Sequence, residues 1–252
     1  MIFCKSREFI FIRTSKNAST SLSLQIQKNI DFQPGDFATE FHNLSPVGIR
    51  ESGRKNIGLL ARSEHPNLSE FIRLGIIEEK EIENFSIYGV LREPVDRFIS
   101  AYNFLYGIHN HFFSYVYEKI NNINLTQEQK LAAESCKYDD FPYKVSISDF
   151  LYFLTNYSDF GEISFEKKLN ENATSKVTMK SSNLRLFKEQ INWIDYPGLT
   201  LLDFHSINTE VNKISEALEI DVGGTSFIQI NTSTKSITAD DLSSSDISLI
   251  KN

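Results

Sequence analysis

Two segments of this 252-residue chain share one pattern: a short apolar run, a polar loop, and then a segment with helical spacing of apolar residues. The first joins the run Phe9–Ile12 to the segment Ser21–Ile26, and the second joins Ser86–Leu91 to a helix that begins at Pro94. Strands that alternate with helices predict an α/β fold, with a central parallel sheet and helices on both faces. Ligands of such sheets bind at the carboxyl ends of the strands, where both polar loops begin.

The rest of the chain continues this alternation. Further helices are predicted over residues 68–74, 78–82, 112–119, 127–135, 147–155 and 207–218, and a further strand over 199–202. Residues 31–62 are rich in Pro and Gly and predict a loop with room for one short strand. No repeat or Pro/Gly-rich linker divides the chain, so we expect one domain over residues 1–252.

Composition excludes several classes of protein. The chain has 26 Lys and Arg against 33 Asp and Glu, a net charge of −7, so we expect no general binding of nucleic acid. No apolar run approaches the ~20 residues of a membrane span. Residues 1–13 carry charges where a secretion signal would be apolar, and we expect a strand there. The two cysteines, Cys4 and Cys136, have neither disulfide nor zinc spacing, which favours a reducing, cytoplasmic location.

The first polar loop has the composition of an anion-binding site. It offers the ammonium group of Lys16, the hydroxyl groups of Ser19, Thr20 and Ser21, and the free N–H groups of a helix start. It contains no glycine and its lysine precedes the small residues, so it does not match the ATP-binding Walker pattern. A Ser/Thr-capped helix with an exposed lysine explains the same residues and remains an alternative.

The second loop places an arginine at a strand end. We expect Arg92 and Ser100, the latter about two turns into the helix, to face one point above the sheet. A guanidinium group suits bidentate contact with phosphate, and a serine adds a hydroxyl donor. Asp96 and Arg97 are predicted to form local pairs or to be solvated, which leaves Arg92 as the functional cation.

Together the segments Ile10–Ser21 and Val90–Tyr102 resemble the two donor-binding motifs of the sulfotransferases that use 3′-phosphoadenosine 5′-phosphosulfate (PAPS). The sequences of the two motifs are most similar to those of the carbohydrate branch, particularly the heparan-sulfate and uronyl 2-O-sulfotransferases. Gln190, Asp203-Phe204 and Asn231–Lys235 follow in family order, so the resemblance extends over most of residues 7–250. The chain ends where the family's C-terminal helix would begin, and we expect that helix to be shortened.

The resemblance implies a P-loop-like sulfotransferase fold and a role for each motif residue. Lys16 would contact the leaving phosphate oxygen and take part in catalysis. Arg92 and Ser100 would hold the 3′-phosphate, with Lys235 nearby. The residues that would hold the 5′-phosphosulfate are Lys16, Asn17, Ala18, Ser19, Thr20 and Ser21. The product PAP would then leave, and no metal would be required.

Transfer to a hydroxyl group also needs a proton acceptor, for which a histidine is suited. The resemblance places His65 where the family has its base, with His42 second and Glu64 third. His109 and His111 are candidates for the acceptor cleft, or else solvated loop residues. His205 is expected to be structural.

The acceptor implied by the resemblance is a saccharide. A basic stretch could contact acidic sugars or could be a solvated loop: Arg50, Arg54, Lys55 and Arg62. An aromatic run could stack on sugars but is more typical of a core: Tyr102, Phe104, Tyr106, Phe112, Phe113, Tyr115 and Tyr117. Two other functions remain open, a small-molecule kinase and a glycan- or nucleotide-binding relative without activity.

Overall fold

The computed structural model describes residues 1–14, 16–39, 67–134, 136, 140–170, 173–181, 184, 187, 196–222 and 237–251. Their contacts separate into two compact units. Unit 1 comprises Met1–Glu93 and Glu189–Asn231, and unit 2 comprises Pro94–Lys188 and Thr232–Asn252. Each unit therefore combines two stretches of chain, and one domain over residues 1–252 stays a prediction.

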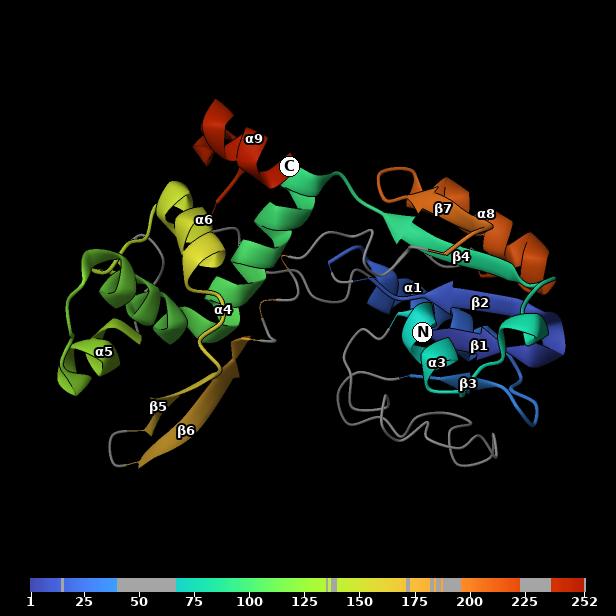
Figure 1. Cartoon of the computed structure of the whole chain (residues 1–252), viewed down its shortest axis with the longest axis horizontal. Coiled ribbons are helices and arrows are strands. Elements are labelled where there is room, and N and C mark those ends of the chain that lie inside the picture. The colour runs from blue at the N-terminus through green and yellow to red at the C-terminus, as the bar shows by residue number, and fades with distance from the viewer. Residues whose placement is uncertain are drawn as a thin grey trace. The chain divides into compact units, whose positions relative to one another are not determined.

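Unit 1 is built on a five-stranded sheet in the order β3-β1-β2-β4-β7 (Figure 1). Its strands are β1 (Ile2–Cys4), β2 (Phe9–Ile12), β3 (Phe37–Ala38), β4 (Ser86–Leu91) and β7 (Leu199–Asp203). The neighbours β2, β4 and β7 run parallel, as expected. The single strand expected at the start of the chain is wrong, because the 3-10 turn η1 (Lys5–Arg7) folds β1 back antiparallel to β2.

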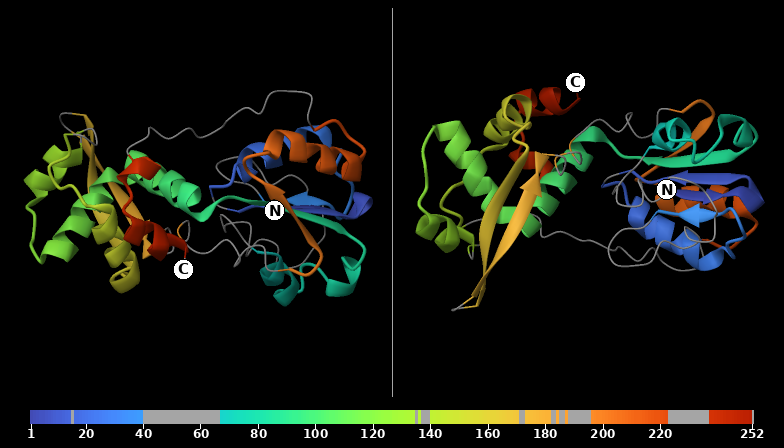
Figure 2. Two further views of the ribbon diagram at one scale, coloured as in Figure 1. Left: turned by 90° about the horizontal axis from the view of Figure 1, so that it is seen from above. Right: turned by 60° about the horizontal axis from the view of Figure 1, so that its bottom comes forward.

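Helices cover both faces of this sheet, which confirms the predicted α/β class. Side chains alternate between the faces along each strand, so Phe9 and Phe11 meet α1 (Ser19–Asn29) and α8 (Ile207–Leu218). Ile10 and Ile12 face the other side, where they pack with α3 (Leu68–Arg73) and with Ile82, which follows the 3-10 turn η2 (Glu79–Glu81). Figure 2 shows α1 and α8 on one face and α3 on the other.

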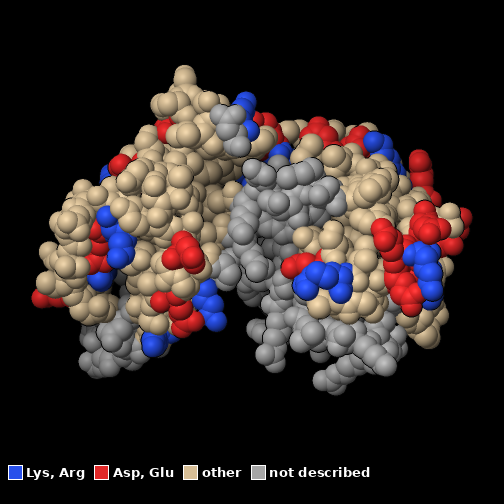
Figure 3. Space-filling view, viewed as in Figure 1, with Lys and Arg blue, Asp and Glu red and all other residues tan. Residues whose placement is uncertain are grey.

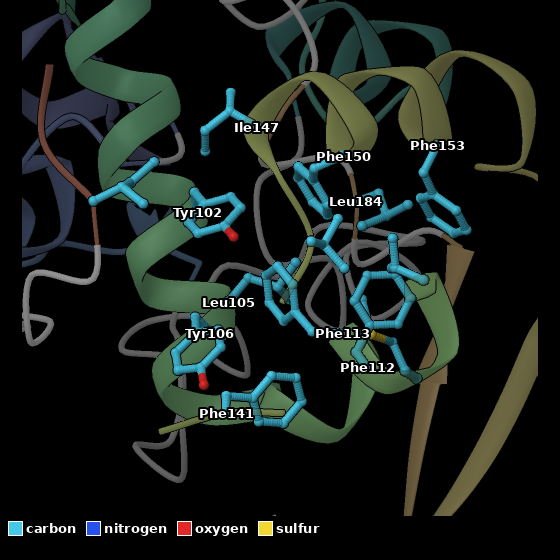
Figure 4. Packing of buried hydrophobic residues seen from close by; sticks show 14 of the residues in the cluster. Tyr102, Leu105, Tyr106, Phe112, Phe113, Phe141, Ile147, Phe150, Phe153 and Leu184 are labelled. Atoms are coloured by element: carbon cyan, nitrogen blue, oxygen red, sulfur yellow. The ribbon is translucent and has the colours of Figure 1, made fainter. Parts of the chain in front are cut away.

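Unit 2 is mainly helical and packs around aromatic side chains. Its elements are α4 (Pro94–Asn121), α5 (Gln127–Glu134), α6 (Ile147–Asn156), β5 (Glu162–Asn170), β6 (Ala173–Lys180), η4 (Ala239–Asp241) and α9 (Ser244–Lys251). Tyr102, Phe113 and Phe150 pack together in its core, with ring centroids 5.0–5.4 Å apart. Figure 4 shows these side chains among the other residues of the cluster. The aromatic run is thus confirmed as core at Tyr102, Tyr106, Phe112 and Phe113.

Two predictions for unit 2 need correction. The helix expected over residues 112–119 is not separate, because α4 is continuous from Pro94 to Asn121. The antiparallel β5–β6 hairpin was not predicted. No helix in the described part of the chain combines the length and apolar character needed to cross a bilayer.

Candidate anion-binding site in unit 1

The loop between β2 and α1 has an unusual backbone. Lys16 and Ala18 both adopt the left-handed conformation, with φ of 63° and 55°, on either side of Asn17. Non-glycine residues rarely adopt this region, and such conformations concentrate at functional sites. Alternation between left- and right-handed residues turns successive N–H groups toward one side, which is the geometry of anion-binding nests. Helix α1 begins directly afterwards at Ser19.

Buried hydrogen bonds tie this loop to β4. The side-chain amide of Asn17 donates to the Val90 carbonyl at 2.7 Å and to the Thr14 hydroxyl at 2.9 Å. The Thr14 hydroxyl donates to the same Val90 carbonyl at 3.1 Å, and the Ser19 hydroxyl donates to the Thr14 carbonyl. Asn17 and Ser19 therefore direct their side chains into the protein. Their expected contacts with a phosphate would come from backbone N–H groups.

The end of β4 brings an arginine to this loop. Arg92 donates from Nη1 to the Lys16 carbonyl at 3.0 Å, and its guanidinium carbon lies 4.2 Å from the ring centroid of Phe204. Phe204 follows β7, and its backbone N–H donates to the Leu91 carbonyl at 2.9 Å. The residues that follow the parallel neighbours β2, β4 and β7 thus lie together at the carboxyl ends of these strands. This is the edge of the sheet at which the sequence predicts a ligand.

The charges at this edge favour an anionic ligand. Burial lowers the pKa of Lys16 from its ordinary 10.5 to about 8, and repulsion from the Arg92 guanidinium acts in the same direction. A negative group beside both cations would relieve that repulsion and favour the charged lysine. On the face shown in Figure 3, acidic and basic side chains of the described residues lie mixed.

Arg13, to which the sequence motifs assign no role, supports the same loop. Arg13 is only 3% exposed. Its guanidinium donates to the Thr39 carbonyl at 3.0 Å and to the Thr20 hydroxyl at 3.1 Å, so it links the edge of the sheet to the first turn of α1. The signal was available, because Arg13 follows a buried strand just as Arg92 does.

The other predicted site residues belong to unit 2 or lie outside the residues that the structure describes. Ser100 is half-buried in the second turn of α4, in unit 2. Arg97 is 6% exposed, so the expectation of a solvated side chain is wrong for it. The residues outside the described part are His65, His42, Glu64, Gln190, Lys235 and the basic stretch Arg50, Arg54, Lys55 and Arg62.

Three histidines lie in described segments. His109 and His111 belong to α4, so the expectation of a loop there is wrong. The His111 side chain is buried, with its ring centroid 4.5 Å from that of Phe165. His205 is exposed, and its backbone N–H donates to Asp203 in the turn before α8. Within the described residues, no three His, Cys, Asp or Glu side chains cluster in a way that could hold a metal ion.

Comparison with known proteins identifies one family. A model of the sulfotransferase family matches residues 1–180 of the 252, a range that contains both the Lys16 loop and Arg92. Searches of curated proteins and of solved structures give no significant match.

Proposed function

This chain belongs to the sulfotransferase family, and we propose that it transfers the sulfuryl group of PAPS to a hydroxyl group of a saccharide. The observation that carries the proposal is the convergence of Lys16 and Arg92 on a loop with two left-handed residues. Such a site suits a ligand with several phosphate charges, because it combines backbone N–H donors, a lysine and a planar guanidinium group.

The donor's groups are assigned to residues as follows. Lys16 and the backbone N–H groups of residues 17–21 hold the 5′-phosphosulfate at the start of α1. Arg92 and Ser100 hold the 3′-phosphate, and Lys235 adds a further positive charge. The resemblance of both motifs supports this assignment, and the side-chain contacts of Asn17 and Ser19 restrict these two residues to backbone contacts.

The proposed chemistry is an in-line displacement at sulfur. The bond from sulfur to the phosphate oxygen breaks, a bond from sulfur to the acceptor oxygen forms, and the acceptor's proton passes to His65. Lys16 stabilises the negative charge that develops on the departing phosphate oxygen, and PAP leaves. His42 and Glu64 are the alternative bases. This assignment uses no metal ion.

The first experiment measures the donor site by calorimetric titration of the purified protein with PAP, beside ATP with Mg²⁺. We expect PAP to bind more tightly than ATP. The substitution Arg92→Ala should lower the affinity for PAP by about tenfold or more, because a charge-assisted contact is lost. The exposed Arg73→Ala in α3 is the control and should leave PAP binding unchanged. Binding of ATP with Mg²⁺ but not of PAP would overturn the proposal in favour of a kinase.

The same preparation then tests catalysis with PAPS labelled in the sulfuryl group and a panel of acidic and neutral glycans. His65→Ala should lower transfer by about 10²–10⁴-fold while PAP still binds, as expected for a general base. Full activity in that variant would remove His65 as the base. A wild-type protein that binds PAP but transfers sulfate to no glycan would contradict the saccharide assignment and favour a binding protein.

A further inference from the structure

The turn between β7 and α8 places an aromatic ring against the site. Phe204 is held from its backbone by the hydrogen bond to the Leu91 carbonyl, which extends the pairing of β7 with β4 beyond the last residue of the strand. Asp203 closes the turn by accepting from the His205 N–H at 3.1 Å and from the Ser206 hydroxyl at 3.0 Å. These bonds hold the pKa of Asp203 below its ordinary value, so its carboxylate stays charged.

The Phe204 ring itself is supported from two further sides. It packs against the apolar core that α1 and α8 form with the sheet, and its centroid lies 5.5 Å from that of His205, at an interplanar angle of 84°. A ring fixed by backbone, core and neighbour offers a rigid surface to whatever lies against it. The group that lies there is the Arg92 guanidinium, 4.2 Å from the ring centroid.

Two of its contacts restrict the movement of Arg92. The Phe204 ring lies against the guanidinium, whose carbon is 4.2 Å from the ring centroid, and the bond from Nη1 to the Lys16 carbonyl limits the rotation of the group. A cation over an aromatic face within ~6 Å is attracted by the ring's quadrupole. Orientation matters for this group, because a guanidinium recognises phosphate through two parallel N–H donors in a fixed fork.

We propose that Phe204 is a positioning residue of the donor site, which holds the Arg92 fork toward the 3′-phosphate and so sets the preference for 3′-phosphorylated nucleotides. This inference rests on the proposed function, because it assigns the 3′-phosphate to Arg92. If Phe204 had only a structural role, any apolar residue of similar size would support the core of unit 1 equally well. The two roles differ in what they require of the side chain, an aromatic face or only apolar volume.

The test uses substitutions that separate these two requirements. Phe204→Leu keeps the apolar character and removes the aromatic face, whereas Phe204→Tyr keeps both. The ligands are PAP and AMP, which differ only by the 3′-phosphate, measured by calorimetry or by competition at high nucleotide concentration. Melting temperatures of all variants report separately on the fold.

We expect Phe204→Leu to lower the affinity for PAP by roughly 3–30-fold, which is the range for the loss of a partly desolvated cation–π contact. Affinity for AMP should stay within about twofold, and Phe204→Tyr should retain the wild-type preference for PAP within about twofold. In the background of Arg92→Ala, Phe204→Leu should cause no further loss, because the group that it positions is absent.

Each contrary result has a distinct meaning. Two results would overturn the positioning role. One is an equal loss of affinity for PAP and AMP in Phe204→Leu. The other is that Phe204→Leu lowers the affinity for PAP as much in the Arg92→Ala variant as in the wild-type protein. Unchanged PAP binding in Phe204→Leu would do the same while leaving the donor site intact. Failure of the wild-type protein to bind PAP would instead refute the proposed function. Should Phe204→Leu not fold, Phe204→Met provides the same comparison, with a flexible side chain that lacks an aromatic face.

Discussion

At the scale of single residues, the site combines cations with a conformation that L-residues rarely adopt. Lys16 has a left-handed backbone, which is strained for a residue other than glycine. Its burial and its position beside Arg92 both disfavour the charged amine in the absence of an anion. Since the loop is fixed by the Asn17 and Thr14 hydrogen bonds to Val90, the protein holds this arrangement before any ligand binds. Such preorganisation lowers the cost of ordering the site on binding.

Because the pKa of Lys16 is lowered, we expect the proposed binding of PAP to depend on pH. Below about pH 8 the amine already carries its proton, whereas above it the unliganded protein loses that proton. A bound anion raises the pKa again, so binding above pH 8 takes up a proton and affinity falls by up to about tenfold per pH unit. Calorimetry in buffers of different ionisation enthalpy measures this uptake. Lys16→Arg should abolish it, and the exposed Lys28→Arg should not; uptake that persists in Lys16→Arg would contradict the assignment.

At the scale of elements, local patterns predicted most of the strands and helices, and packing decided the exceptions. A separate helix was predicted over residues 112–119, but Leu105, Tyr106 and Phe112 all pack into one core and α4 is continuous through them. The β5–β6 hairpin had a signal that was not used, because Ile163 with Phe165 and Val177 with Met179 alternate at a period of two residues. Their pairing, Ile163 with Met179 and Phe165 with Val177, is visible only in the structure.

One buried amide joins α4 to the C-terminal segment. Asn103 is 3% exposed, donates from Nδ2 to the Ile237 carbonyl at 3.0 Å and accepts from the Ile237 N–H at 2.9 Å. Asn103→Ala should lower the free energy of unfolding by about 2–4 kcal/mol, because two buried backbone groups lose their partner. The exposed Asn121→Ala on the same helix should change it by less than about 0.5 kcal/mol. Urea denaturation compares the two, and equal effects would show that the Ile237 contact is not important for stability.

At the scale of the whole molecule, the fold of unit 1 requires chain that the family match does not include. The match ends at residue 180, but β7 pairs with β4, and Val211, Ile214 and Leu218 of α8 cover the sheet face beside Leu22. Phe204 also lies in this later stretch. The candidate site therefore depends on contacts between residues more than a hundred positions apart.

A truncation series tests this dependence. A chain of residues 1–180 should lack a cooperative unfolding transition and should not bind PAP, because β4 has lost its neighbour β7 and the apolar cluster that α8 shares with α1 is left partly uncovered. A chain of residues 1–242 keeps all of unit 1 and loses α9, whose Asp246 accepts from Ser148 and whose Ile250 packs against the core of unit 2, so it should still bind PAP. Binding of PAP by residues 1–180 with the affinity of the whole chain would show that β7 and α8 are dispensable.

Local sequence patterns were sufficient to predict the two strand–loop–helix segments and the residues that each loop presents, because hydrophobic periodicity and helix-start signals act over a few neighbouring residues. The same patterns identified Lys16 and Arg92 as the candidate cations. Only the three-dimensional structure shows that β1 turns back antiparallel to β2, that Arg13 and Arg97 are buried, and that the Phe204 ring lies against Arg92. The turn of β1 is local and depends on the 3-10 turn η1. The contacts of Arg13 with Thr39 and of Arg92 with Phe204 join segments distant in the chain, on which a local pattern carries no information.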